Sequence, residues 1–335
     1  MIDFFKIYRR IPDGLTCAMR LATVELLRSA YGKYALGAFN VSNLEQVHGL
    51  FRGAVKARAP FIVQFTRVMR DYADPLMLEQ LLRGAEAIYP NAVFAVHHDH
   101  GDEASCADAI ASGHYNSVMI DASHLPFDEN VRVTRRVVEQ AHARGNAVEA
   151  ELGQLKGVED EMSHEVKEAI LTDPAKAGEF VERTGCDSLA LAIGTSHGAY
   201  KFGGSQRLHL DRLAEIQERL AGFPLVLHGG SGVPHEEIRR INNAGGQLDT
   251  SASGVSESEI SDAIRLGVAK VNIGTDGRLI WTRVHREFFR DKPGEFDFMP
   301  PGRIYMEEYA TFVESKCRSL GAAGKLQQFI NSVPG

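Results

Sequence analysis

Three histidines stand where a chain could build a catalytic centre, since His100, His197 and His228 each end or closely follow a short apolar run. Three imidazoles can hold a tetrahedral Zn²⁺ and leave its fourth position open for substrate, which is the arrangement of a catalytic zinc site. A metal ion held in this way acts as a Lewis acid on a carbonyl group or generates hydroxide from water. Imidazole suits Zn²⁺ best, although Fe²⁺, Co²⁺ and Mn²⁺ accept the same ligand type. The first hypothesis is therefore a catalytic metal centre.

Carboxylates occupy comparable positions in the sequence. Asp99 directly precedes His100, Asp121 lies in the next apolar run, and Glu149 and Glu151 lie in the run after that. A buried polar network that only rigidifies the fold is the alternative interpretation. Neighbouring side chains on a regular strand point to opposite faces, so Asp99 and His100 serve one site only if the strand end is irregular.

Glycine-rich turns accompany two of the histidines. Gly198 lies three residues before Lys201, and Gly229 begins a Gly-Gly-Ser-Gly run that precedes Pro234. Glycine lets backbone approach a ligand closely, and a loop that leads into a helix presents N–H groups to an anion, most often phosphate. Tight turns need glycine in any case, so the run alone is weak. Beside a metal site and a lysine it indicates phosphate recognition.

The elements that must position these residues are short apolar runs separated by stretches with helical periodicity. In Glu45–Arg58 and Asp128–Arg144 the apolar residues recur three and four apart, and Asp173 before Pro174 predicts another helix start, as does Pro234. Eight runs have the length and the Val, Ile, Leu or Phe content of strands. These runs are Leu36–Val41, Phe61–Thr66, Val93–His100, Ser117–Ser123, Ala147–Gly153, Ser188–Gly194, Pro224–Gly230 and Lys270–Asp276.

Strands that alternate with helices predict an α/β fold with a parallel sheet. A doubly wound open sheet is the alternative, and the number eight favours closure into a (β/α)8 TIM barrel. The polar residues described above would then gather at the C-terminal mouth of the barrel, where active sites of this fold are found.

The whole chain, 1–335, is predicted to form a single domain with its barrel core at about 35–292. An extra N-terminal helix over Thr16–Gly32 is expected to cover the bottom of the barrel. A C-terminal helical extension is expected at about 299–332, within which Met299–Phe329 has the helical pattern. Ala244–Ser258 is rich in Gly and Ser and predicts an exposed loop before the last strand.

Bulk composition excludes several classes of protein. A hydrophobic content of 44% fits a globular protein with a sizeable core, and a net charge of −7 without a basic stripe argues against a nucleic-acid partner. No apolar run approaches the ~20 residues that span a bilayer, so no membrane role is expected. The N-terminus lacks the apolar segment of a signal peptide. The cysteines form no C-x-x-C pair, which predicts a reducing, cytoplasmic location.

Several motifs together resemble the class II, metal-dependent fructose-bisphosphate aldolase family. Val96–Gly101 reads Val-His-His-Asp-His-Gly and is similar to the H-x-D-H-G signature of that family. Val148–Gly153, followed by Gly157 and Glu159, is similar to its second signature. The motifs of the sixth, seventh and eighth predicted strands also match in order. The resemblance runs from about Ala35 to Arg303, and the motifs are specific only in combination.

The resemblance implies a metal-dependent aldehyde-lyase on a TIM barrel. It implies reversible retro-aldol cleavage of fructose 1,6-bisphosphate to dihydroxyacetone phosphate and glyceraldehyde 3-phosphate, in glycolysis, gluconeogenesis or the Calvin cycle. Zn²⁺ on the substrate carbonyl would stabilise the carbanion as an enediolate, so no lysine Schiff base is needed. A homodimer or homotetramer is also implied, and a second divalent ion and a monovalent cation such as K⁺ or Na⁺ are compatible with the family.

The resemblance also implies roles for the metal-binding residues. His100, His197 and His228 match the ligands of the catalytic Zn²⁺. Asp121 and Glu151 match the positions that hold a second or displaced metal ion.

Two carboxylates match the acid and base residues of the family. Asp99 would handle the proton of the C4 hydroxyl, and Glu159 would exchange the proton at the dihydroxyacetone phosphate carbon. Arg278 would reach the far phosphate, from the same or a neighbouring subunit. The positions expected to bind substrate are Thr66, Gly198, Lys201, Gly229, Gly230, Ser231, Asn272, Ile273, Gly274, Thr275 and Arg278.

Three positions depart from the family pattern. Gly274 stands where many fructose-specific members carry an aspartate that reads the stereochemistry of the sugar hydroxyl. Lys156 replaces a glycine of the mobile-loop signature. Arg67 and Met69 follow Thr66 where small residues are common. A tagatose 1,6-bisphosphate aldolase, or another ketose-phosphate aldolase, is therefore the nearest alternative.

Two hypotheses from other classes are weaker. A metal-dependent hydrolase on the same fold uses similar strand-end residues, but such barrels usually carry an H-x-H pair on the first strand, and Leu36–Val41 has none. A non-catalytic phosphate-binding or scaffold protein would not need the nearly complete set of acid, base and ligand residues.

Overall fold

The computed structural model describes residues 18–154, 170–195 and 207–330. Eight parallel strands form a closed barrel, because each strand pairs with the next along the chain and the last pairs with the first. Each of the eight predicted runs overlaps one of these strands, which confirms the TIM barrel over the open sheet. The barrel strands are β2 (Leu36–Asn40), β3 (Phe61–Thr66), β4 (Val93–Gly101), β5 (Ser117–Ile120), β6 (Ala147–Leu152), β7 (Ser188–Leu191), β8 (Leu225–Leu227) and β9 (Val268–Ile273).

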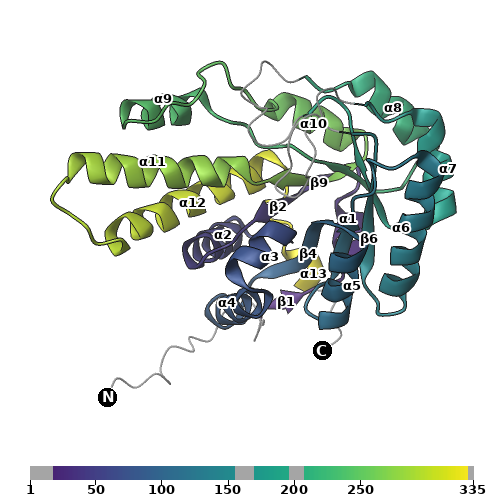
Figure 1. Ribbon diagram of the computed structural model, residues 1–335, viewed down its shortest axis with the longest axis horizontal. Helices are drawn as coiled ribbons and strands as arrows, with labels where there is room; N and C mark the ends of the chain where they lie inside the picture. Colours follow the sequence, from purple (N-terminus) through teal and green to yellow (C-terminus); the bar gives the residue numbers. More distant parts are fainter. Residues whose placement is uncertain (1–17, 155–169, 196–206, 331–335) are drawn as a thin grey trace.

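Helices surround this barrel (Figure 1). Several start as the sequence predicts, since Asp173 caps a helix whose first residue is Pro174, and its side chain accepts from Ala175 N at 2.9 Å. The helices after the first strand of the barrel are α2 (Leu44–Ala57), α3 (Arg67–Ala73), α4 (Pro75–Ile88), α5 (Glu103–Ser112), α6 (Phe127–His142), α7 (Pro174–Thr184), α8 (Leu210–Arg219), α9 (His235–Asn243), α10 (Glu257–Arg265), α11 (Thr275–Asp291), α12 (Met299–Ser319) and α13 (Gln327–Ile330).

The N-terminal segment differs from the single helix predicted for Thr16–Gly32. Within its described part, Met19–Arg20 forms strand β1, and the helix α1 covers only Thr23–Ala30. Strand β1 pairs with the start of β4, because β5 pairs with β4 only from His97 onward and leaves that edge open. Helix α1 lies at the bottom of the barrel as predicted, since Thr23 donates to Ser117 at the first residue of β5.

Helices α11 and α12 lie side by side and extend away from the barrel as a long hairpin (Figure 1). Helix α12 also packs closely against α2, where a Cβ at Gly53 would clash with the carbonyl oxygen of Ala310. Glycine is therefore required at that crossing. The predicted extension Met299–Phe329 is confirmed as helical but is divided, because α12 ends at Ser319 and α13 follows after a turn.

The segment between α9 and α10 is a loop, as predicted for Ala244–Ser258, but it is only partly exposed. Ala252 and Val255 are buried, and Ala252 packs into a small apolar cluster with residues of α9 and α11. The loop also ends earlier than predicted, since Ser256 forms a capping box with Glu259 and starts α10 at Glu257. Pro234 likewise stands just before the first residue of α9.

Polar side chains alternate along the inner face of the barrel. Glu149 and Glu151 on β6 both face inward, as do Lys270 and Asn272 on β9, because residues two apart share a face of a strand. The interior is therefore a stack of side-chain layers rather than an open channel. None of the helices in the described ranges is long and apolar enough to cross a membrane.

Candidate metal centre and active site

Strand β4 ends in the histidine-rich motif, and its side chains alternate as a strand requires up to Asp99. His97 and Asp99 face the barrel interior, while His98 faces outward and contacts Phe65 O at 3.2 Å and Ser105 Oγ at 3.1 Å. Burial, followed by the charge of Arg70, lowers the pKa of His98 to about 4, so this imidazole is neutral at pH 7. His98 therefore ties β4 to its surroundings instead of entering the site.

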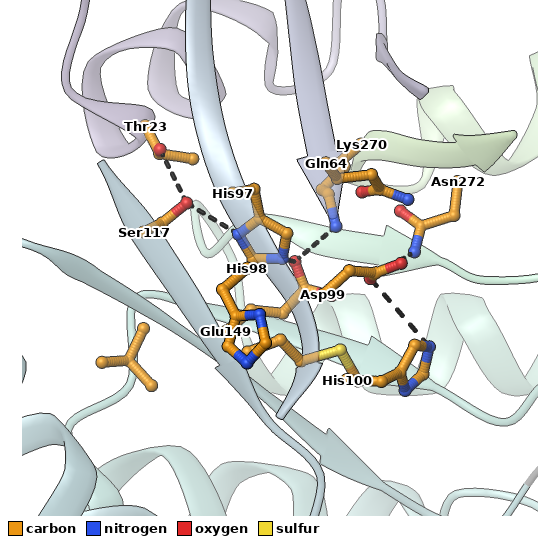
Figure 2. Close-up of polar contacts among 12 residues, drawn as sticks. Thr23, Gln64, His97, His98, Asp99, His100, Ser117, Glu149, Lys270 and Asn272 are labelled. Carbon is orange, nitrogen blue, oxygen red and sulfur yellow. Dashed lines mark hydrogen bonds and ion pairs between the residues drawn. The ribbon is translucent and has the colours of Figure 1, made fainter. Parts of the chain in front are cut away.

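The end of β4 is irregular, as the sequence required for Asp99 and His100 to share one site. The pairing of β4 with β5 gains one extra residue between His98 and Gly101, and His100 adopts a positive φ of 47°. Such a bulge re-aims the side chains around it. As a result Asp99 and His100 both face the mouth of the barrel, with His100 Nε2 4.0 Å from Asp99 Oδ1 (Figure 2).

His100 and His228 converge on one point. Nε2 of His100 lies 2.9 Å from Nδ1 of His228, and the two rings are nearly perpendicular at 89°. Two nitrogens bound to a tetrahedral ion at 2.0–2.1 Å would lie about 3.3 Å from each other. The rings of His100 and His228 therefore need to move only slightly apart to bind an ion between them. Ligand atoms of Asp99, His100 and His228 lie within 4.8 Å of one another. These residues therefore fit a metal ion.

Two carboxylates face the other nitrogen of His100. Asp121 Oδ2 lies 3.3 Å from His100 Nδ1, and Glu151 Oε2 lies 3.9 Å from it. Asp121 is held by Ser123, which donates to Asp121 Oδ1 through its backbone N–H and its hydroxyl group. A carboxylate on the far nitrogen of a metal-binding histidine fixes its ring and tautomer. His100, Asp121 and Glu151 also form a second group that could hold an ion.

Asp99 is clamped between two amide groups. Asn40 Nδ2 donates to its Oδ2 at 2.9 Å, and Asn272 Nδ2 donates to its Oδ1 at 3.2 Å. Gln64 in turn donates to Asn40 Oδ1 at 2.8 Å and fixes the orientation of that amide. Burial alone would raise the pKa of Asp99, but the electrostatic influence of His100, Lys270 and His228 outweighs it and lowers the pKa. The Asp99 carboxylate is therefore ionised and ready to accept a proton.

A second polar layer lies deeper in the barrel. Lys270 Nζ contacts Glu149 Oε2 at 2.8 Å, while Glu149 Oε1 lies 2.8 Å from His228 Nε2. His97 bonds Ser117, which bonds Thr23, so that the layer continues to the bottom of the barrel (Figure 2). Burial, followed by the charge of Lys270, lowers the pKa of His97 to about 3.

Sequence reasoning placed Glu149 among the carboxylates of the barrel mouth but gave it no role, and it did not assign Asn40, Gln64, His97 or Lys270 to the site. Their common signal was present in the sequence, because each is a polar residue inside an otherwise apolar run. Four of them, all except Asn40, also lie two residues before an assigned or charged partner on the same strand, the spacing of one strand face.

Three backbone N–H groups of the glycine-rich turn after β8 have partners within the protein. The N–H groups of Gly232 and Val233 both donate to the carboxylate of Asp276, and Gly230 N donates to Asn272 O. Ser231 is buried, and its hydroxyl accepts from Gly274 N at 3.3 Å. The N–H groups of Gly230, Gly232 and Val233 are therefore engaged within the protein.

Helix α11 begins at Thr275, directly after β9, and its first backbone N–H groups face the mouth of the barrel. Gly274 precedes this helix, and Ile273 is buried in β9. Arg278 lies in the first turn and is exposed. Thr66 ends β3, is buried, and caps α3 by accepting from Met69 N at 3.3 Å.

Four expected site residues lie outside the described residues. These are the metal ligand His197, the substrate-binding residues Gly198 and Lys201, and the proton-exchanging residue Glu159. The departure at Lys156 also lies outside them.

The comparisons with known proteins show the family of this chain. A family model described as fructose-bisphosphate aldolase class-II matches residues 22–247 and 250–325. The chain belongs to the class II fructose-bisphosphate aldolases. Over 297 residues it is 43% identical to the fructose-bisphosphate aldolase of Giardia intestinalis, covering 87% of this aldolase and 90% of its relative. It is 42% identical to that of Thermus caldophilus, covering 92% and 100%.

Solved aldolase structures share the fold. The YdjI aldolase of Escherichia coli K12 has a TM-score of 0.71 at 29% identity, covering 92% of this aldolase and 100% of that chain. A Coccidioides immitis chain assigned to the fructose-1,6-bisphosphate aldolases has a TM-score of 0.76 at 28% identity, covering 92% and 98%. Class II aldolases are metal-dependent lyases, and in the described part of this aldolase the two groups around His100 could hold such an ion.

Proposed function

We propose that this class II aldolase cleaves fructose 1,6-bisphosphate reversibly to dihydroxyacetone phosphate and glyceraldehyde 3-phosphate. The observation that carries the proposal is the joint placement of Asp99 and the two imidazoles. The bulge at the end of β4 brings the Asp99 carboxylate within 4.0 Å of Nε2 of His100, the same nitrogen that faces His228. A base beside an ion-binding pair is what a retro-aldol reaction at a ketose carbonyl needs.

The catalytic ion is proposed to be Zn²⁺, held by His100 and His228, with His197 expected as the third ligand. When bound, the ion supplies positive charge to the carbonyl side of the bond that breaks. Two neutral imidazole nitrogens favour Zn²⁺ over the harder cations, which prefer oxygen. Asp121 and Glu151 are proposed to orient His100 and to offer a place for a second divalent ion. A monovalent cation such as K⁺ or Na⁺ is compatible with the site.

Asp99 is proposed to take the proton of the C4 hydroxyl as the C3–C4 bond breaks. Asn40 and Asn272 hold its two oxygens, so the base is oriented before substrate arrives. Glu159 is the proposed base for the proton at the dihydroxyacetone phosphate carbon. The two proton transfers are thus assigned to different residues, which makes them separable by experiment.

Phosphate recognition is proposed at the start of α11. Thr275 and the hydroxyl of Ser231 lie on this side of the barrel mouth, and Gly198, Lys201 and Gly229 are the further expected contacts. For the far phosphate we propose Arg278, whose exposure suits contact with a ligand at the rim or across a subunit boundary. Thr66, Gly230, Asn272 and Ile273 complete the proposed binding surface.

A second candidate substrate is tagatose 1,6-bisphosphate, which differs at C4. The observation behind it is the position of Gly274, since a Cβ built there lies 3.2 Å from Asn40 Oδ1, and Asn40 bonds the base Asp99. Position 274 therefore borders the hydroxyl group whose configuration distinguishes the two sugars. With glycine there, no side chain at this position reads that hydroxyl.

The chain is further proposed to form a single domain over 1–335 and to assemble as a homodimer or homotetramer. Phe296 and Phe298 near the end of the α11–α12 hairpin are strongly exposed, and Met299 and Ile304 beside them are also exposed. Large exposed apolar patches mark association surfaces.

Cys106, Cys186 and Cys317 are free thiols, which supports a cytoplasmic location.

The deciding experiment is a steady-state cleavage assay on the two bisphosphates with metal-stripped protein, before and after addition of Zn²⁺. We expect cleavage of fructose 1,6-bisphosphate that disappears with EDTA, returns with Zn²⁺, and is not inactivated by borohydride with substrate. Activity that survives thorough metal removal would contradict the metal-dependent reaction. A higher kcat/KM for tagatose bisphosphate would establish the second candidate instead.

A further inference from the structure

Beneath the proposed metal ligands, a lysine and a glutamate face each other across the barrel interior. Lys270 lies on β9 and Glu149 on β6, two strands that are not neighbours in the sheet. Lys270 has no exposed surface and Glu149 is 3% exposed, and their charged atoms are 2.8 Å apart. Burial of two charges costs desolvation, and a well-packed apolar pair is often at least as stable. The pair therefore calls for a role other than stability.

The two oxygens of Glu149 have different partners. Oε2 accepts from Lys270 Nζ, and Oε1 lies 2.8 Å from His228 Nε2, in the direction of the metal centre. A carboxylate can only accept a hydrogen bond, so this contact requires the proton on Nε2 of His228. The lone pair of Nδ1 then faces His100 Nε2, 2.9 Å away, where an ion would bind.

Asn272 also contacts His228, but it does not select one of the two nitrogens. Asn272 Nδ2 lies 3.2 Å from Nε2 and 3.4 Å from Nδ1 of His228. Nearly equal distances to both nitrogens place this amide off the lone-pair direction of either one, where a hydrogen bond is weak. The Glu149 contact is shorter and involves a single nitrogen.

We propose that Glu149 and Lys270 are positioning residues for the metal centre. Glu149 holds His228 in the tautomer whose Nδ1 can bind an ion, and Lys270 fixes which carboxylate oxygen faces the histidine. The inference rests on the proposed function in one respect, because it takes His228 as a metal ligand. A carboxylate behind a metal-binding imidazole is a general device for fixing its ring orientation.

The test uses the charge pattern of the pair. In Glu149→Gln, the single side-chain oxygen turns to Lys270, and the NH₂ group then faces His228 Nε2. That donor favours the opposite tautomer, with the proton on Nδ1, and blocks the ion. In the double variant Glu149→Gln with Lys270→Met, no cation claims the oxygen, so the amide can turn and accept from Nε2–H.

Metal affinity of the full-length protein is measured by competition between a chelator and Zn²⁺, and by the absorption bands of the Co²⁺-loaded protein. We expect Glu149→Gln to weaken affinity by about 10–100-fold and the double variant to recover most of that loss. Glu139→Gln, the same substitution at an exposed position of α6, should leave affinity unchanged. Melting temperatures of the metal-free forms show whether each variant is folded.

Unchanged affinity in Glu149→Gln would overturn the proposal. A double variant that binds no better than Glu149→Gln would also overturn it, because a purely structural role predicts no rescue from losing the lysine. The proposed function is tested separately by cleavage with the wild-type protein. Wild-type protein that binds Zn²⁺ but cleaves neither bisphosphate would remove the proposed function and leave the positioning inference to the affinity data.

Discussion

Replacing Asp99 with Asn should separate the base of the reaction from the metal centre. The substitution keeps the size of the side chain and removes its capacity to take a proton. Loss of a positioned general base costs typically about 10²–10⁴-fold in kcat, or roughly 3–5 kcal/mol of transition-state stabilisation. We expect cleavage by Asp99→Asn to fall by that amount, while Zn²⁺ stays bound through the histidines.

The structure also sets the cost in folding stability. Both oxygens of Asp99 accept from amides, whereas Asn has one oxygen, so one of the two donors must lose its acceptor. Asn40 cannot turn over, because its oxygen is engaged by Gln64. The Asn272 amide can turn over, because its Oδ1 has no hydrogen-bond partner among the described residues. That oxygen could then accept from the new amide at position 99. The cost should therefore be near the lower end for a buried polar group, about 1 kcal/mol.

Two assays on the same variant test this reasoning. Cleavage is followed in a coupled assay, and exchange of a dihydroxyacetone phosphate proton with solvent is followed by NMR. Exchange should persist in Asp99→Asn, because that proton transfer is assigned to Glu159. Asp128→Asn, at an exposed position of α6, is the control and should match the wild type in both assays. If exchange falls as far as cleavage, or if kcat stays within tenfold of the wild type, Asp99 is not the base.

Two further changes test specificity and assembly. Gly274→Asp places a carboxylate beside Asn40. We expect the ratio of kcat/KM for fructose bisphosphate over tagatose bisphosphate to rise by about tenfold or more, because a group that bonds one hydroxyl configuration penalises the other. An unchanged ratio would show that position 274 does not read this hydroxyl. Phe296→Ser with Phe298→Ser removes the exposed aromatic rings of the hairpin, and sedimentation velocity should then show a smaller assembly. The same mass in the variant and the wild type would place the subunit interface elsewhere.

Much of the fold could be predicted from the sequence because the apolar pattern is local. Eight buried strands appear as eight apolar runs, and a parallel barrel follows from their alternation with helices. The errors occurred where tertiary contacts override local pattern. Met19–Arg20 forms a strand because β4 offers it an open edge, and Arg20 is held there by Glu79 and Glu86. Ala252 is buried because α9 and α11 cover it.

The sequence by itself determined which residue types stand at the strand ends, and therefore that His100, His228 and Asp99 belong to one mouth of a barrel. The tertiary structure decided how they face one another. Asp99 and His100 share a site only because one extra residue in β4 reverses the pleat, and pairing with β5 creates that irregularity. It also revealed Glu149 and Lys270 behind His228. Side chains from β6, from β9 and from the residue that follows β8 meet inside a closed barrel, and no local pattern encodes a distance across it.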